Sequence, residues 1–235
     1  VPSFMPVVNR NSFALKSPNP SCVTVLVPGS GCYLYLLFTS MQAGALPIEI
    51  VGVISNREDA YALTRAKDAD IPVAVLSHVA SGKRMGIKTF ETHASAQLSA
   101  WQPDLIVLAG FMRVLSAGFI DSIPVPMINL HPALLPAYKG LDTHQRAIQA
   151  GERHHGCSIH VVTAELDAGA VLTQALLEVY QKDTADSLQA RVQKLEHQLL
   201  PWTILLLAKG VINLNSQGKE TFSMLPTLPL KLYLS

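Results

Sequence analysis

The stretch "VTVLVPGSGCYLYLLFTSM", residues 23–41, indicates the fold class of this chain. It begins with a short apolar run, 23–28, which is typical of a strand that is buried on both faces. The glycines of 29–31 interrupt this run, and an apolar stretch of helical character follows. A strand, a glycine-containing turn and a helix in this order are typical of an open α/β sheet. The turn is weak evidence for a dinucleotide site, because Leu34 stands where a G-x-G-x-x-G pattern needs its third glycine.

The same alternation continues further along the chain. Four more apolar runs have the length of strands, namely 49–55, 71–77, 104–110 and 126–130. Segments with apolar residues at helical spacing, such as 57–70 and 86–101, lie between them. Near-continuous apolar strands separated by helices predict a Rossmann-like, mostly parallel sheet with helices on both faces.

The pattern changes after residue 156. Two strand-like segments, 157–163 and 170–179, predict a strand pair added to the sheet, which we expect to be antiparallel. The segment 183–210 then predicts a long helix on the C-terminal side. Thr184 can cap its start, and Pro201 is expected to kink or divide it.

Chain length and composition favour one domain with short flanking segments. The 235 residues include about half apolar residues, which suffice for one sizeable core. We expect a disordered N-terminal extension at 1–21, rich in Pro, Ser and Asn, a single domain at 22–214, and a C-terminal tail at 215–235.

Charge and hydropathy exclude several classes of partner. The net charge is +1 and no basic run exceeds Lys83-Arg84, so nothing indicates binding to nucleic acid. Apolar stretches such as 203–208 are far shorter than the roughly 20 residues that a membrane span needs. The start of the chain lacks the continuous apolar segment of a signal peptide. The cysteines, Cys22, Cys32 and Cys157, form no C-x-x-C pair, which favours free thiols and a cytoplasmic location.

The expected sheet places its candidate ligand-binding segments on one edge. In parallel α/β sheets, ligands bind outside the carboxyl ends of the strands. This rule brings 29–31, 110–115 and 129–131 together.

Asn129 and His131 are the strongest candidates for chemistry on this edge. Residues i and i+2 of a strand point to the same side, so both side chains can converge on one ligand atom. An imidazole titrates near neutral pH and can serve as acid or base, and an amide donor suits a carbonyl oxygen that gains charge. The competing interpretation is a structural histidine that bonds a loop carbonyl, beside an asparagine that caps a strand end.

Asp167 is a further candidate, in the loop "TAELDAGA". A carboxylate that meets His131 would orient the imidazole and raise its pKa. Its neighbours Ala168-Gly169 also fit an ordinary turn. No metal site is expected, because His154, His155 and His160 lack a matching set of ligands. A serine hydrolase has little support without a G-x-S-x-G motif.

Three segments resemble one family. They are "IVLAGFMRVLS" (106–116), "NLHPALLPAYKGLDTHQRAI" (129–148) and "HGCSIHVVTAELDAGAVL" (155–172). They resemble the folate-dependent formyltransferases, and within these the phosphoribosylglycinamide formyltransferase branch of purine synthesis. The resemblance extends from about residue 23 to 214.

The resemblance implies transfer of a formyl group from 10-formyltetrahydrofolate, as co-substrate, to the primary amine of glycinamide ribonucleotide, without a metal. By matching positions, His131 would be the catalytic acid, Asn129 would stabilise the oxyanion, and Asp167 would keep the imidazole charged and oriented. The implied folate contacts, besides Asn129 and Asp167, are Met112, Arg113, Val114, Leu115, Thr163, Ala164, Glu165 and Leu166. The implied ribonucleotide contacts are Gly31, Cys32, Tyr33, Gln193, Lys194, Leu195 and Glu196. Whether the enzyme is a monomer or a homodimer stays open.

The chain departs from the family pattern at two places. The family has Gly-Ser-Asn at the phosphate loop, where this chain has Gly31-Cys32-Tyr33 and so loses two polar donors. The family also has an arginine near position 87, where this chain has Ile87 followed by Lys88. Weaker substrate binding or a changed acceptor is therefore a hypothesis.

Two alternatives remain at this stage. The first is a formyltetrahydrofolate hydrolase-like enzyme, which would use the same Asn, His and Asp but carries an additional N-terminal domain. The related methionyl-tRNA enzyme carries an additional C-terminal domain, for which the residues after Leu214 are too few. The second is a catalytically weakened, folate-binding homologue, supported by the altered phosphate loop alone.

Overall fold

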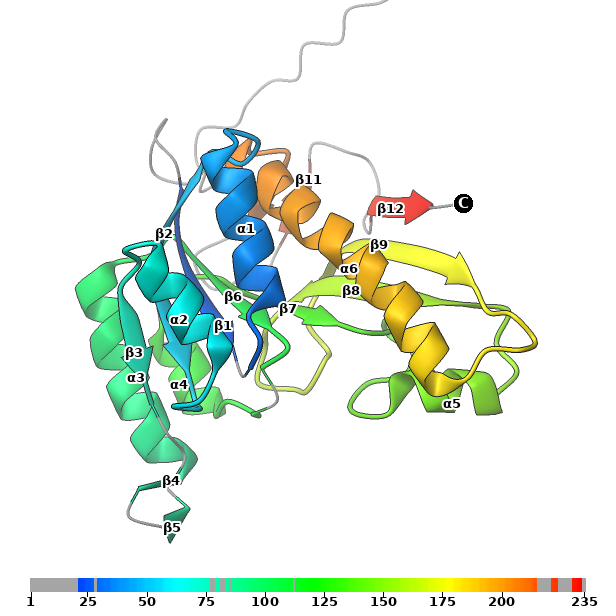
Figure 1. The fold of residues 1–235 in the computed structure, drawn as a ribbon, viewed down its shortest axis with the longest axis horizontal. Coiled ribbons are helices and arrows are strands. Elements are labelled where there is room, and N and C mark those ends of the chain that lie inside the picture. The colour runs from blue at the N-terminus through cyan, green and yellow to red at the C-terminus, as the bar shows by residue number, and fades with distance from the viewer. Residues whose placement is uncertain are drawn as a thin grey trace, which may run out of the picture.

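The chain folds around one large mixed sheet (Figure 1), seen here in a computed structural model that describes residues 21–27, 29–76, 79–80, 83–84, 86–111, 113–214, 221–223 and 230–233. Within these residues the sheet has eight strands in the order β12-β9-β8-β7-β6-β1-β2-β3. Their bounds are β1 Ser21–Val27, β2 Ile48–Ser55, β3 Val73–Val75, β6 Leu105–Ala109, β7 Met127–His131, β8 His154–Val161, β9 Val171–Glu178 and β12 Leu230–Tyr233.

The strand directions confirm the predicted sheet. Strands β3, β2, β1, β6 and β7 pair in parallel, whereas β8 is antiparallel to β7 and β9 is antiparallel to β8. The predicted strand pair is therefore present and antiparallel. Strand β12 extends the sheet in parallel beside β9. It lies in the segment expected to be a tail, because four residues are too few to show a strand pattern in the sequence.

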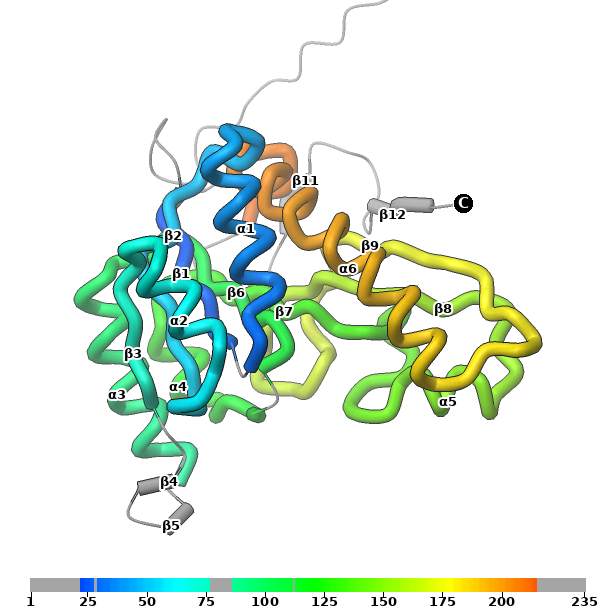
Figure 2. Tube along the Cα trace, viewed as in Figure 1, coloured from blue at the N-terminus to red at the C-terminus, as the bar shows by residue number. Residues whose placement is uncertain are grey.

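Helices cover both faces of this sheet (Figure 2). They are α1 Cys32–Gln42, α2 Tyr61–Asp68, α3 Ile87–Trp101, α4 Ala117–Ser122, α5 Thr143–Gln149 and α6 Ala185–Ala208. Two small antiparallel pairs lie outside the sheet, β4 Val79–Ala80 with β5 Lys83–Arg84, and β10 Ile212–Leu214 with β11 Thr221–Ser223. The sequence did not predict α4 and α5, which have two turns or fewer. None of the helices in the described residues is long and apolar enough to cross a membrane.

Alternation along β1 divides the core into two clusters. Val23, Val25 and Val27 are buried with residues of α1, α2 and α6, whereas Leu26 is buried with residues of α3 and α4. Figure 1 shows α1 and α6 crossing the same face. Strands β1, β2 and β6 therefore carry apolar side chains on both faces, as their near-continuous apolar runs predict.

Helix α6 lies within the predicted segment 183–210 and is less interrupted than the sequence suggests. Thr184 and Ser187 form a capping box at its start, as a threonine at this position predicts. Pro201 lies inside the helix but does not divide it, so the expected division is wrong. The buried residues Leu199, Leu200 and Ile204 pack this turn into the core, and this packing offsets the hydrogen bond that proline cannot make.

Gly156 allows β8 and β9 to approach closely. A Cβ atom at this position would overlap the carbonyl oxygen of Ala175 on β9. We expect Gly156→Ala to lower the free energy of unfolding by about 1–3 kcal/mol, because the backbone must move to relieve the overlap. Urea unfolding measures this change. Gly118→Ala in α4, where a Cβ meets nothing within 4 Å, is the matched control and should be neutral or stabilise by less than about 1 kcal/mol. Equal unfolding midpoints for the two variants would contradict this account of the strand pair.

Candidate active site

The carboxyl ends of β1, β6 and β7 meet at one edge of the sheet, as predicted. Leu26 of β1 pairs with Leu108 of β6, and Ala109 of β6 pairs with Leu130 of β7. The chain leaves β1 toward β2 on one side and adds β6 and β7 on the other side. The order of the strands therefore reverses at β1, and such a reversal is where open α/β sheets bind ligands.

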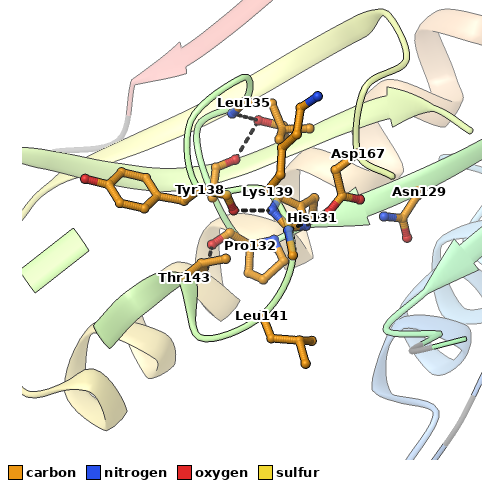
Figure 3. Close-up of polar contacts among 12 residues, drawn as sticks. Asn129, His131, Pro132, Leu135, Tyr138, Lys139, Leu141, Thr143 and Asp167 are labelled. Atoms are coloured by element: carbon orange, nitrogen blue, oxygen red, sulfur yellow. Dashed lines mark hydrogen bonds and ion pairs between the residues drawn. The ribbon is translucent and has the colours of Figure 1, made fainter. Parts of the chain in front are cut away.

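Asn129 and His131 lie on the same side of β7. Ile128 and Leu130, which alternate with them, are buried in the core cluster below α6. Asn129 is half-buried, and His131 is 5% exposed at the last position of the strand. Figure 3 shows both side chains beside Asp167 at the end of β7. The i, i+2 convergence that the sequence predicted is therefore present.

His160 completes a polar cluster on this edge. Asn129 and His160 are cross-strand partners in the antiparallel pair β7–β8, so their side chains share a face. The Asn129 Nδ2 lies 3.1 Å from His160 Nε2, and His160 Nδ1 lies 2.9 Å from the carbonyl oxygen of Val161. This second contact gives Nδ1 the proton in a neutral ring, so Nε2 accepts a hydrogen bond from the Asn129 amide. The second hydrogen of that amide remains for a ligand.

Asp167 joins both histidines. Its carboxylate oxygens lie 3.4 Å from His131 Nδ1 and 3.5 Å from His160 Nε2, and it accepts a 2.9 Å hydrogen bond from the Gly140 amide. Burial alone would raise the pKa of Asp167, but its contact with His160, the hydrogen bond from the Gly140 amide and the charge of His131 outweigh burial and lower the pKa. The carboxylate is therefore charged at neutral pH.

His131 is held at both ring nitrogens. Its Nε2 donates a 2.9 Å hydrogen bond to the carbonyl oxygen of Tyr138, while Nδ1 faces Asp167. Burial lowers the pKa of His131, and the Tyr138 carbonyl and Asp167 charge oppose that shift without reversing it. The carboxylate thus acts in the predicted direction, but the net shift is downward because desolvation is the larger effect. The ring bonds a loop carbonyl, as the structural interpretation predicts, and it also meets the carboxylate of Asp167.

The loop that follows His131 is fixed by buried polar groups of β8 and β9. Ser158 Oγ donates to the Ala133 carbonyl at 2.6 Å and accepts from the Leu135 amide at 3.1 Å. Gln174 Nε2 donates to the Leu135 carbonyl at 2.9 Å. These bonds fix the loop so that the Tyr138 carbonyl accepts from His131 and the Gly140 amide donates to Asp167.

A second histidine pair lies behind this loop. His144 Nδ1 is 3.1 Å from His155 Nε2, and His155 is 1% exposed. Burial, with a smaller contribution from the neighbouring His144, lowers the pKa of His155 to about 4. The native protein therefore keeps this ring neutral where an unfolded chain would protonate it.

This shift predicts acid sensitivity. The unfolded chain binds a proton at His155 near pH 6.5, so its contribution to stability is complete above that pH and is lost as pH falls toward 4. We expect His155→Asn to remove about 1–3 kcal/mol of the decrease in unfolding free energy between pH 7 and pH 4. His154→Asn, at the exposed neighbouring position, is the control. Urea unfolding at several pH values measures the slopes, and identical slopes for both variants would disprove the assignment.

The glycine turn after β1 leads directly into α1. Gly31 is the N-terminal cap of the helix, with φ 68°, and a Cβ there would lie 2.6 Å from the Cβ of Ala62. Glycine is therefore required at this position. No side chain among the described residues caps this end of α1, so its first amides can accept an anion.

The start of α1 packs against the middle of α6. The Tyr33 hydroxyl donates a short hydrogen bond to Glu196 Oε2, and Gln193 Nε2 lies 4.0 Å from Cys32 Sγ. Two segments that the family resemblance assigned to one substrate are therefore in contact. Gln193 is exposed, and Glu196 is buried at the same face of α6 one turn later.

A model of the formyl transferase family matches residues 22–204. The chain belongs to this family. It is 36% identical over 192 residues to the phosphoribosylglycinamide formyltransferase of Haemophilus influenzae, an alignment that covers 82% of this chain and 89% of that protein. It is also 35% identical over 210 residues to the trifunctional purine biosynthetic protein adenosine-3 of Bos taurus, of which it covers 20%.

Solved structures agree with this family assignment. The phosphoribosylglycinamide formyltransferase of Coxiella burnetii, solved in complex with CHES, superposes with a TM-score of 0.78 at 42% identity. The match covers 87% of this chain and 94% of that one. The fold predicted from the apolar runs is therefore the formyl transferase fold.

The segment after β6 that the resemblance assigned to folate has both exposed and buried side chains. The segment after β6 begins beside His131, with Val114 63% exposed. Leu115 is buried in the core, so only its backbone can face a ligand. Met112 lies outside the described residues, and Arg113 packs over the ring of Phe90 at 5.1 Å.

The remaining predicted contacts fall into exposed and buried groups. In the loop before Asp167, Ala164, Glu165 and Leu166 are exposed, and Thr163 Oγ1 donates to the Glu165 carbonyl at 3.1 Å. On α6, Lys194 is exposed, whereas Leu195 is buried in the core and cannot present its side chain to a nucleotide.

The two predicted terminal segments lie mostly outside the described residues. Of the extension predicted at 1–21, only Ser21 is described, and of the tail predicted at 215–235, only β11 and β12 are described.

Sequence reasoning missed His160, Ser158 and the Tyr33–Glu196 contact. A signal for the first two was present, because Ser158 and His160 have the same i, i+2 spacing on a strand as Asn129 and His131. Among the described residues no group of three metal-ligating side chains could hold an ion.

Proposed function

We propose that this chain transfers the formyl group of 10-formyltetrahydrofolate to the amine of glycinamide ribonucleotide. The products are formylglycinamide ribonucleotide and tetrahydrofolate, in the purine biosynthetic pathway. The observation that carries the proposal is the cluster of Asn129, His131 and Asp167 at the ligand edge of a formyl transferase sheet. The relatives that match over most of their length are phosphoribosylglycinamide formyltransferases.

The cluster suits a reaction that passes through a tetrahedral intermediate. The amine of the acceptor attacks the formyl carbon, and the formyl oxygen gains negative charge. The free hydrogen of the Asn129 amide is placed to donate to this oxygen, because its other hydrogen is bound to His160. The amide is held before the reaction, so little reorganisation is needed as the charge develops.

His131 supplies the proton that the departing folate nitrogen requires. The amine nucleophile loses a proton as the new C–N bond forms, and the folate nitrogen gains one as the old bond breaks. In this proposal His131 holds a proton between these steps, its Nε2–H leaves the Tyr138 carbonyl to reach the folate nitrogen, and Asp167 favours the charged form of the ring. Asp167 is therefore a positioning residue and His131 a catalytic residue in this proposal.

In this proposal each substrate binds at a different part of the sheet edge. In this proposal the folate lies along 112–115 and 163–167, and the nucleotide phosphate binds the first amides of α1 at 31–33. Backbone amides at a helix start can bind phosphate without polar side chains, so they compensate for the Ser and Asn donors that the family has and this chain lacks. The site belongs to one catalytic domain, 22–214, in a protein for which the cytoplasm is the expected location.

The acceptor dependence of folate deformylation tests the function. Absorbance follows the formation of tetrahydrofolate from 10-formyltetrahydrofolate with and without glycinamide ribonucleotide. Turnover that requires the ribonucleotide supports the proposal. Equal turnover without it would identify a hydrolase, and folate binding without turnover would identify a weakened homologue.

A further inference from the structure

Tyr33 occupies a position that links the two halves of the acceptor site. It is the second residue of α1, and its hydroxyl donates to Glu196 of α6. Its ring packs edge-on against His197, with centroids 5.4 Å apart. The tyrosine is therefore held at its ring by one residue of α6 and at its hydroxyl by the residue before it.

Glu196 depends on this hydroxyl. The residue is 6% exposed, and within the described part of the chain the Tyr33 hydroxyl is the only hydrogen-bond donor to its carboxylate. Burial raises the pKa of Glu196, and the Tyr33 hydrogen bond opposes this shift. A buried carboxylate that loses its donor must find another one or take up a proton.

The same carboxylate is within reach of a ligand that sits on the start of α1. The phosphate of the acceptor binds the amides around Tyr33 in the proposed function, so its ribose lies next to the Tyr33–Glu196 contact. A ribose hydroxyl and a tyrosine hydroxyl are chemically alike as donors to a carboxylate. A ribose hydroxyl that approaches Glu196 Oε2 from the side of α1 therefore competes with the Tyr33 hydroxyl for the same acceptor position.

We propose that Tyr33 is a specificity-determining residue for the acceptor, whose hydroxyl occupies Glu196 until a ribose hydroxyl of the acceptor takes its place. This inference rests on the proposed function. A ligand with a ribose hydroxyl must displace the Tyr33 hydroxyl to bond Glu196, whereas a ligand without one leaves the Tyr33–Glu196 hydrogen bond intact. Tyr33 thereby lowers the affinity for acceptors that carry the hydroxyl and leaves the affinity for those without it nearly unchanged, so it reduces the discrimination between them.

Tyr33→Phe tests this inference, with Tyr35→Phe as the matched control. Tyr35 lies two residues later on α1, is 54% exposed and contacts Arg65 through its ring, which phenylalanine retains. Calorimetry measures the Kd for glycinamide ribonucleotide, and steady-state assays measure KM for both substrates. We expect Tyr33→Phe to lower the Kd for the ribonucleotide about tenfold, because no hydroxyl must be displaced, and to leave KM for the folate unchanged. Tyr35→Phe should match the parent protein.

A deoxyribose analogue of the acceptor sharpens the test. It should gain less than about twofold in affinity from Tyr33→Phe, because it cannot use the released carboxylate. An unchanged or weaker affinity of Tyr33→Phe for glycinamide ribonucleotide, in a variant with the parent's melting temperature, would overturn the inference. An equal gain for both acceptors would also overturn it.

Failure of the proposed function gives a different result. It appears in the parent protein itself, which would then neither bind nor formylate glycinamide ribonucleotide, and this result overturns both proposals. If the parent binds the ribonucleotide without turnover, calorimetry alone still decides the role of Tyr33.

Discussion

Replacing His131 by alanine is expected to lower kcat for formyl transfer by about 10²- to 10⁴-fold, the usual contribution of a general acid. The imidazole lies at the end of β7 with Asp167 at one nitrogen and the Tyr138 carbonyl at the other. Alanine removes the proton carrier but leaves Asn129 and the exposed folate loop intact. The Kd for the folate should therefore remain within about threefold of the parent value, because binding and proton transfer depend on different groups.

Stopped-time assays measure kcat, and fluorescence titration measures the Kd for the folate. His154→Ala is the control, because this histidine is exposed at the start of β8 and contributes nothing to the cluster. Circular dichroism checks that the variants are folded. Retention of more than about a tenth of parental turnover by His131→Ala would refute its assignment as the catalytic acid.

Asp167→Asn is expected to lower turnover at pH 7 by about 10²- to 10³-fold. Asparagine can still accept the hydrogen bond from the Gly140 amide, so the variant removes the charge and keeps the loop in place. Burial lowers the pKa of His131 and Asp167 opposes this, so loss of the charge lowers that pKa further. Less of the protonated imidazole is then present at neutral pH, by a factor of ten for each unit.

The pH dependence of kcat distinguishes this positioning role from a structural one. In Asp167→Asn the fall in activity on the basic side should move to lower pH. Asp142→Asn is the matched control, because Asp142 is an exposed loop residue whose side chain does not cap α5. A uniform loss of activity with an unchanged pH profile would show that Asp167 only maintains the loop.

The local sequence pattern was sufficient to predict the sheet and the side-by-side placement of Asn129 and His131. Short apolar runs define β1, β2, β6 and β7, and strand alternation places Asn129 and His131 on one side. The helices α4 and α5 and the strand β12 were not predicted, because such short elements are determined by their tertiary contacts and not by periodicity.

Contacts between distant segments could not be derived from the residues alone. The pairing of Asn129 with His160 depends on the register of β7 and β8, which the long connection between them does not fix. Asp167 was joined to His131 only through the family resemblance. Tyr33 and Glu196 are separated by 163 positions, and their contact depends on how α1 and α6 cross. The family pattern marked Tyr33 as a departure without indicating which residue it meets.

The fate of the formyl carbon tests the central claim most directly. A single turnover with 10-formyltetrahydrofolate labelled with carbon-13 in the formyl group, in the presence of glycinamide ribonucleotide, can be followed by NMR. The account predicts that the label appears as a formamide on the amine of the ribonucleotide, at a rate that His131→Ala reduces by about 10²-fold or more. Label that appears as free formate, or that stays on the folate, would contradict it.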